Sequence, residues 1–264
     1  MIDARYEFAL RVIREAAGLL SHRDEAKIPF QTKHGHQDIV SQFDKKIEAY
    51  ISGKIAQSYP DDGVIGEESP THSHGERNWF IDPIDGTSNF VNQQKNFAIS
   101  IACYAGEEPL FGLVLDVAAN KLYHAKVGEG AFCNGIPLPV RTPRRELSEL
   151  FLYSPIIQLA FFADHPQRKG FMRLANDVRA IRSLGSVALE ICALAVHEAD
   201  IFLTARSSPW DHNAARIILS EAGGEIRTWE NKVVPIDQDC SVIAATSPEL
   251  LDEIILNYLA VCEG

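Results

Sequence analysis

Apolar residues recur every three or four positions near the start of the chain, with charged residues between them. This period is typical of an amphipathic helix. Arg11, Arg14 and Glu15 exclude the unbroken apolar stretch that a signal peptide or membrane span needs. A second helix is predicted over 43–57, where isoleucines repeat at helical spacing before the turn sequence at 60–63. The first helical face consists of Ala9, Val12, Ile13, Ala16 and Leu20.

Short apolar runs separated by turn residues follow the second helix and predict a series of strands. Asn134-Gly135 tolerates left-handed backbone and predicts a hairpin turn near the end of this series. The strands succeed one another without helices between them. We therefore expect two helices and an antiparallel sheet, which together form an α+β lobe over residues 1–145. The predicted strands cover residues 64–66, 79–82, 97–104, 110–117 and 121–127.

The second half of the chain alternates between strand-like and helix-like segments. This alternation predicts an α/β lobe over residues 146–264, joined to the first lobe in a single domain spanning 1–264. A crevice between the lobes, or at strand ends in the second lobe, is the expected place for a ligand. The predicted strands cover 151–154, 201–204, 225–229 and 242–245, and the predicted helices cover 168–178, 186–198, 211–222 and 248–261.

Composition narrows the class of protein. A chain of 264 residues with 46% hydrophobic residues is large enough for a substantial core. Its formal net charge of −11 argues against a general nucleic-acid surface, because phosphate backbones attract patches of Lys and Arg. The same charge would repel an anionic substrate unless cations are bound. Dispersed cysteines predict reduced structural thiols in a cytoplasmic protein, and they are Cys103, Cys133, Cys192, Cys240 and Cys262.

The segment Trp79–Phe90 combines an apolar run, two acids and a turn. The proline after Asp82 disfavours helical backbone at that aspartate, which is therefore expected at the end of a strand. Asp85 and the glycine after it form a turn signal, and Thr87 or Ser88 can cap a following helix. Two carboxylates followed by N–H groups that can face an anion suit a hard divalent cation and a phosphate.

Other acids also stand where a predicted strand ends or a helix begins. Glu67 follows an apolar run, and Asp44 and Asp211 lie near predicted helix starts. Each alone has an ordinary explanation, a solvated loop for Glu67 and helix capping for the two aspartates. Chance would supply roughly five acid pairs with the spacing of Asp82 and Asp85 at average acid placement, so that spacing alone is uninformative. Four converging carboxylates exceed what one Mg²⁺ needs and suit two or more ions that share a bridging acid.

Taken together, these segments resemble the signatures of the inositol monophosphatase family. The resemblance implies a layered αβαβα fold of the inositol monophosphatase and fructose-1,6-bisphosphatase type. It also implies a Mg²⁺-dependent phosphomonoesterase that is commonly a homodimer and often sensitive to lithium. The order and spacing match from about residue 3 to 260. The matching segments are Gly66-Glu67-Glu68, Asp82-Pro83-Ile84-Asp85-Gly86-Thr87, Trp210-Asp211 leading to Glu221-Ala222-Gly223-Gly224, Asp38–Ser41 with Asp44, and Arg182–Ser186.

The resemblance also implies which residues bind the metal, with two or three Mg²⁺ ions per site. By position, Glu67, Asp82 and the main-chain carbonyl of Ile84 would hold the first ion. Asp82, Asp85 and Asp211 would hold the second, which makes Asp82 the bridging ligand.

The same resemblance assigns the attacking water and the phosphate. Glu67 and Thr87 would position and deprotonate the water, with Thr87 oriented by Asp44. Gly86, Thr87 and Ser88 would offer backbone N–H groups to the phosphate, beside Asp85. Water is the nucleophile in this scheme, so no covalent phosphoenzyme is implied.

Substrate choice is where this chain departs from the family pattern. Inositol-selective members carry a Glu seven residues before the metal-binding Asp, where this chain has Thr204. A hydroxyl lacks the charge of that acceptor, and the lost contact is worth roughly 1.5–3 kcal/mol. Arg206 is either solvated or attracts a second phosphate or carboxylate. Gly185 and Ser186 begin a predicted helix near the substrate, where capping alone would also explain them.

Other functions stay open at this point. Relatives use the same apparatus to hydrolyse fructose 1,6-bisphosphate or 3′-phosphoadenosine nucleotides, and a regulatory protein of transcription complexes could retain the fold. The pairs His34/His36 and His72/His74 suggest zinc, but neither has suitably spaced Cys partners. We expect a small phosphate ester as the substrate, with no direct nucleic-acid contact and no membrane association.

Overall fold

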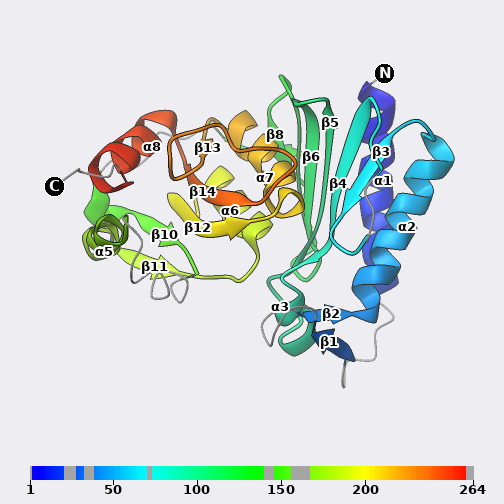
Figure 1. Cartoon of the computed structure of the whole chain (residues 1–264), viewed down its shortest axis with the longest axis horizontal. Helices are drawn as coiled ribbons and strands as arrows, with labels where there is room; N and C mark the ends of the chain where they lie inside the picture. Colours follow the sequence, from blue (N-terminus) through cyan, green and yellow to red (C-terminus); the bar gives the residue numbers. More distant parts are fainter. Residues whose placement is uncertain are drawn as a thin grey trace.

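The computed structural model describes residues 2–20, 28–32, 39–69, 73–139, 146–155 and 167–259 of the chain. Its main elements form five layers across Figure 1, in the order helices, sheet, helices, sheet, helices. The predicted αβαβα fold is confirmed. The helical layers are α1 (Ile2–Leu20) with α2 (Gln42–Ser58), then α6 (Val187–Ala195) with α7 (Pro209–Glu221), and finally α5 (Arg168–Asp177) with α8 (Pro248–Ile254).

The first sheet has seven strands whose spatial order follows the chain. The prediction of a purely antiparallel sheet is wrong at one edge, because β3 and β4 are parallel. The connection between them returns to the start of β3, where Ser73 N donates to Val64 O at 3.0 Å. The seven strands are β3 (Gly63–Gly66), β4 (Arg77–Asp85), β5 (Ala98–Ala105), β6 (Glu108–Asp116), β7 (Lys121–Lys126), β8 (Ala131–Cys133) and β9 (Ile136–Pro137).

The predicted hairpin turn is confirmed between β8 and β9. Asn134 and Gly135 have φ of 50° and 78°, the left-handed backbone that a tight two-residue hairpin requires. The two strands pair in antiparallel fashion, with Cys133 opposite Ile136.

The second sheet has the strand order β11-β10-β12-β14-β13. Strands β10, β11 and β12 are mutually parallel, and β14 pairs antiparallel with both β12 and β13. Strand β11 escaped sequence analysis because its three residues are half-buried or exposed, which leaves no apolar pattern. The five strands are β10 (Phe151–Tyr153), β11 (Ala180–Arg182), β12 (Ile201–Ser207), β13 (Glu225–Arg227) and β14 (Cys240–Ala245).

Side chains of β4 are buried on both faces of the first sheet, as its apolar run predicts. Trp79 and Ile81 pack with the helices α1 and α2, whereas Phe80 packs with the central helices. A third apolar cluster joins the outer face of the second sheet to α5 and α8. Each sheet is therefore covered on both sides, which is what fixes the five-layer order.

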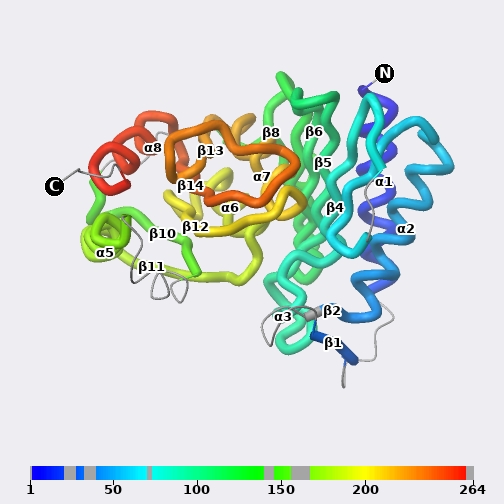
Figure 2. Tube along the Cα trace, in the orientation of Figure 1, coloured from blue at the N-terminus to red at the C-terminus, as the bar shows by residue number. Residues whose placement is uncertain are grey.

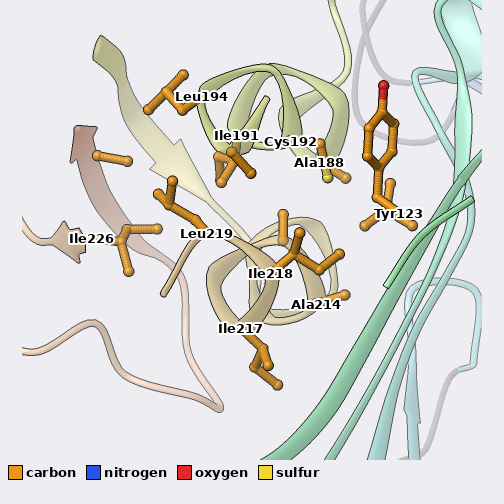
Figure 3. Close-up of a cluster of buried hydrophobic side chains, with 14 of the residues drawn as sticks. Tyr123, Ala188, Ile191, Cys192, Leu194, Ala214, Ile217, Ile218, Leu219 and Ile226 are labelled. Carbon is orange, nitrogen blue, oxygen red and sulfur yellow. The ribbon is translucent and has the colours of Figure 1, made fainter. Parts of the chain in front are cut away.

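The central helices α6 and α7 fill the space between the sheets. Figure 3 shows Ile191 and Cys192 of α6 beside Ile218 of α7, with Tyr123 of the first sheet facing them. Helix α7 lies close to β6 at Gly112, where a Cβ atom would come within 2.4 Å of Ala214 O. Both helices belong to the second half of the chain yet contact the first sheet, so the division into lobes at residue 145 stays a prediction.

Several predicted helix ends shift in the structure. Helix α6 ends at Ala195 rather than at 198. Helix α8 continues beyond Ile254 as one π-helical segment, Ile255–Leu259, so the predicted helix over 248–261 is helical as far as the described residues reach. Helices α1 and α8 lie at opposite ends of the molecule, and a short helix α3 (Thr87–Asn92) lies beside the small β1–β2 sheet (Figure 2). Strands β1 and β2 span Phe30–Thr32 and Ile39–Ser41. No helix among the described residues is long and apolar enough to span a bilayer.

Candidate active site

The acidic segment of β4 is a bulged strand end. Asp82 faces Ser100 of β5, and the next recorded pair is Asp85 with Ala98, so β4 carries one extra residue between the two acids. The prediction that Asp82 ends the strand is wrong, since β4 runs on through Pro83 to Asp85. The bulge turns the N–H of Ile84 towards the first acid, and it donates to Asp82 Oδ1 at 2.9 Å.

Gly86 follows the bulge and is the N-cap residue of α3. Its φ of 91° lies in the left-handed region, which a glycine adopts without strain. The prediction that Thr87 or Ser88 caps this helix is wrong, because the cap has no side-chain hydrogen bond. Instead Thr87 is half-buried in the first turn, and Ser88 is exposed.

Asp44 connects α2 to this turn. Ser41 is the N-cap of α2, and Asp44 completes a capping box, with Oδ2 accepting from Ser41 N at 2.8 Å and from Ser41 Oγ at 2.6 Å. Its other oxygen, Oδ1, accepts from Thr87 Oγ1 at 3.0 Å. The Thr87 hydroxyl also lies 3.0 Å from Ile84 O. Capping is therefore one role of Asp44, and the orientation of Thr87 is a second.

Asp85 lies against the N-terminus of α6. It accepts from Ser186 Oγ at 2.5 Å, from Ala188 N at 2.7 Å and from Val187 N at 3.2 Å. Ser186 is also the N-cap of α6, as predicted, and Gly185 before it has a φ of 79°. The helix start and the acidic bulge are distant in sequence but in direct contact in the structure.

Asp211 and Glu67 approach the same region from other elements. Helix α7 begins at Pro209 with Ser208 as its N-cap, so the prediction that Asp211 opens the helix is corrected by two residues. Asp211 stands in the first turn and accepts from Ser208 N at 2.8 Å. Glu67 directly follows β3, and its N–H donates to Ile81 O at 3.2 Å, which places it next to the start of the acidic bulge.

The charges of these acids act on one another. Burial raises the pKa of Asp82 well above its usual range, and the charges of Glu67, Asp85, Asp211 and Asp44 raise it further. Burial likewise raises the pKa of Asp85 to about 6, despite the hydrogen bonds from α6. The pKa of Asp211 is raised by burial and then by the charges of Asp85 and Glu67. The charges of all four other predicted acids therefore act on Asp82.

The residues present fit a hard divalent cation. Asp82 is 2% exposed and Asp85 is 7% exposed, and two buried acids of like charge are costly unless a cation is nearby. Within the described ranges, no three Asp, Glu, His or Cys side chains form a compact ligand cage. Carboxylate oxygens are nevertheless the ligands that Mg²⁺ prefers, and Mg²⁺ usually keeps several of its waters.

Sequence analysis missed three buried polar residues that hold the site's loops. Glu48 of α2 accepts from Glu68 N at 2.8 Å and so fixes the loop that follows Glu67. Glu190 of α6 and Asn89 of α3 both bond to the segment just before α6. One signal was available, since Glu190 is the lone charged residue in an otherwise apolar helix.

The predicted substrate contacts of the second sheet are less direct. Thr204 is buried on β12. Its hydroxyl donates to Arg206 O at 3.1 Å, so the hydroxyl proton is already hydrogen-bonded within the same strand. Arg206 is exposed and pairs with Asp239 at 2.7 Å. The charge of Asp239 also raises the pKa of Asp211, which places this ion pair near the acidic site. Whether either residue contacts a substrate stays a prediction.

The structure describes one residue of the two histidine pairs and four of the five cysteines. His74 is exposed, and His34, His36, His72 and Asp38 lie outside the described residues. The described cysteines, namely Cys103, Cys133, Cys192 and Cys240, are all free, while Cys262 lies outside the described part.

Comparisons with known proteins agree with the motifs. Residues 1–261 match the model of the Inositol monophosphatase family. The chain is 34% identical over 260 residues to inositol-1-monophosphatase of Bacillus subtilis, with 96% of each chain covered. It is 33% identical over 228 residues to fructose-1,6-bisphosphatase/inositol-1-monophosphatase of Thermotoga maritima, with 86% of each covered.

Solved structures give the same answer for the fold. Inositol monophosphate-bound SaIMPase-II matches with a TM-score of 0.84 and 33% identity, covering 97% of this chain and 93% of that one. The inositol monophosphatase of Thermotoga maritima matches with a TM-score of 0.85 and 31% identity, covering 98% of each chain. The chain therefore belongs to the inositol monophosphatase family, and it is a phosphatase of inositol phosphate or related sugar phosphates.

Proposed function

We propose that this protein is a Mg²⁺-dependent phosphomonoesterase that uses an activated water to hydrolyse inositol monophosphate or a related sugar or polyol phosphate. The observation that carries the proposal is that Asp82 is buried among other acids whose charges raise its pKa, namely Glu67, Asp85, Asp211 and Asp44. Asp44 in turn accepts a hydrogen bond from Thr87. Acids from β4, α7 and the loop after β3 meet there, although they are far apart in sequence.

Two or three Mg²⁺ ions would bind at these acids. Glu67, Asp82 and the carbonyl of Ile84 would hold one ion, and Asp82, Asp85 and Asp211 another. When bound, Mg²⁺ lowers the pKa of a coordinated water and stabilises negative charge on the phosphate oxygens. The bulge at Ile84 supports the main-chain ligand. The N–H of Ile84 donates to Asp82 and the carbonyl of Ile84 points towards Thr87, so both backbone groups of Ile84 lie at the proposed site.

Thr87 and Glu67 would position the attacking water. A hydroxyl has one proton, so when Thr87 donates to Asp44 its lone pairs are left to accept from a water. The half-buried carboxylate of Glu67 would accept the proton that the water gives up. The backbone N–H groups of Gly86, Thr87 and Ser88 would hold the phosphate at the start of α3.

Mg²⁺ is expected to stabilise the protein more at high pH than at low pH. The raised pKa of Asp85 means that the folded protein holds this proton more tightly than the unfolded chain. Stability from this source is full below the ordinary pKa of about 4 and is lost as the pH rises through the raised value. Mg²⁺ binds the deprotonated acids and offsets that loss. With Mg²⁺ at about 100 times its Kd near pH 8, Tm should rise by roughly 5–10 °C.

The measurement is a thermal melt with Mg²⁺ and with EDTA at each pH. Burial lowers the pKa of His124 and of His212 to about 4, so these groups cost stability as the pH falls below about 6.5. The difference between the Mg²⁺ and EDTA melts cancels that contribution. A Mg²⁺-induced shift that is equal near pH 5 and near pH 8 would contradict the acidic metal site.

A substrate panel tests the proposed reaction. Phosphate release should require Mg²⁺ and should fall in Li⁺, with inositol monophosphate, sugar monophosphates, fructose 1,6-bisphosphate and a 3′-phosphoadenosine nucleotide as substrates. Because Thr204 stands where inositol-selective relatives have Glu, we expect more than one polyol phosphate to be hydrolysed at similar kcat/KM. No release from any of these substrates would reject the proposal.

Fructose 1,6-bisphosphate is the favoured second substrate. The Thermotoga maritima relative is named for both activities, and Arg206 is a cation near the site whose exposed pairing with Asp239 is cheap to exchange.

We further propose a cytoplasmic homodimer with reduced thiols, for which light scattering of the purified protein tests the dimer. A regulatory role in transcription complexes stays an alternative that a pull-down with mass spectrometry would test.

A further inference from the structure

Buried side chains hold the segment 183–186 from two sides. Glu190 of α6 is 2% exposed, and one of its oxygens accepts from Leu184 N and, at 3.1 Å, from Gly185 N. Asn89 of α3 donates its amide to Leu184 O at 2.6 Å. The N–H groups and a carbonyl of one short segment are therefore fixed by two different helices.

This segment carries one donor to Asp85 and leads directly into the first turn of α6, which carries the others. It ends at Ser186, whose Oγ donates to Asp85 at 2.5 Å, and Ala188 N donates to the same carboxylate at 2.7 Å. The segment also touches the acidic turn directly, because a Cβ on Gly86 would lie 3.0 Å from Gly185 O. A displacement of the segment would therefore move the donors that orient the Asp85 carboxylate.

An ordinary explanation for Glu190 is that it merely satisfies two N–H groups before a helix. A buried carboxylate is an expensive means to that end, because it loses its hydration within an apolar helix. Burial raises the pKa of Glu190, which reflects this cost. A carboxylate is favoured at this position if the loop must be held in one conformation, because hydrogen bonds to a charged acceptor are stronger than those to a neutral one.

We propose that Glu190 is a positioning residue of the metal site, which acts by clamping 183–186 so that Ser186 and the first turn of α6 hold Asp85 in its ligand orientation. The inference rests on the proposed function, since it assigns Asp85 to Mg²⁺. Outer partners of metal ligands typically contribute 10–100-fold, as an order of magnitude, to metal affinity or activity.

Mg²⁺ titrations of three variants test the clamp. Glu190→Ala removes both acceptor oxygens. Glu190→Gln keeps one oxygen that can still accept from Leu184 and Gly185. Gln167→Ala is the matched control, since Gln167 is also buried and also makes two hydrogen bonds to the backbone. Its amide donates to two carbonyls, at the end of the molecule that holds α5 and the π-helical segment Ile255–Leu259. Each titration is followed by Tm, which needs no activity, and by phosphate release.

The expected result separates positioning from general stability. Glu190→Ala should raise the Mg²⁺ concentration for the half-maximal Tm shift and for half-maximal activity by about 10-fold or more, and Glu190→Gln by less. Gln167→Ala should lower Tm in EDTA and leave both Mg²⁺ midpoints unchanged. Wild-type midpoints in Glu190→Ala would overturn the inference, and if that variant does not fold, wild-type midpoints in Glu190→Gln would overturn it. A wild-type protein with no Mg²⁺ response would reject the proposed function itself.

Discussion

Asp82→Asn is expected to lower kcat/KM for phosphate release by about 10³-fold, because Asp82 is the proposed bridge between two Mg²⁺ ions. The substitution changes charge and little else. An amide oxygen can still accept from Ile84 N, which now bonds Asp82 Oδ1 at 2.9 Å, so the bulge should keep its shape. The measurement is steady-state phosphate release at saturating Mg²⁺, with inositol monophosphate and one sugar monophosphate.

The same variant should be at least as stable as the wild type when metal is absent. Burial and the neighbouring acids raise the pKa of Asp82, which means that ionised Asp82 destabilises the folded protein at neutral pH. A neutral amide removes that repulsion, so the Tm in EDTA should rise or stay level while the Mg²⁺-induced shift disappears. Loss of activity together with a lower Tm in EDTA would point to damage of the fold instead.

Asp177→Asn is the matched control for the loss of one charge. Asp177 lies in α5 of the outer helix layer, where it accepts from Tyr258 Oη at 2.6 Å. This variant should keep wild-type activity and the full Mg²⁺ response. If Asp82→Asn also retains near-wild-type activity, the assignment of Asp82 as a bridging ligand is wrong.

Patterns in the sequence were sufficient to predict most strands and helices, and the family resemblance implied their layered order. The apolar run before Asp82 predicts a strand covered on both faces, and Trp79 and Phe80 do pack into different clusters on the two sides of β4. Periodicity works here because burial on one or both faces leaves a regular signature. It fails for β11, whose side chains are half-buried or exposed.

Local geometry at the acids was less predictable. The proline after Asp82 indicated the end of a strand, but a bulge allows β4 to accommodate it and to continue to Asp85. Capping was assigned to Asp211, whereas Ser208 is the cap and Asp211 lies three residues into the motif. The second correction arises because a carboxylate in a first turn can accept from backbone N–H groups at several positions, and the sequence does not choose among them.

The contacts that join the two halves of the site left only one sign in the sequence. Glu190 and Asp85 are more than a hundred positions apart, and their link passes through backbone N–H groups that carry no sequence signal. The meeting of α6 with the acidic bulge depends on how the central helices pack between the sheets. A buried charge in an apolar helix was the one visible sign that such a contact existed.

Thr87→Val is expected to lower kcat by about 10²–10³-fold, which lies within the range for a group that takes part in a proton transfer. Valine keeps the volume of threonine and loses only the hydroxyl, which lies 3.0 Å from Asp44 Oδ1. The buried Asp44 then loses a donor, at a cost of about 1–3 kcal/mol, so Tm in EDTA should fall. This fall is opposite in sign to the effect of Asp82→Asn. Thr87→Ser, which keeps the hydroxyl, should restore most of the activity and of the stability.

A double-mutant cycle of Thr87 and Glu67 shows whether the Thr87 hydroxyl positions the attacking water or only stabilises the turn. If both side chains position one water, the double variant Thr87→Val with Glu67→Gln should be little slower than Glu67→Gln alone, because residues that act as a unit are strongly non-additive. If Thr87 only stabilises the turn through Asp44, the two losses should multiply. Single-turnover phosphate release by the four proteins of this cycle, at saturating Mg²⁺ and substrate, separates the two outcomes.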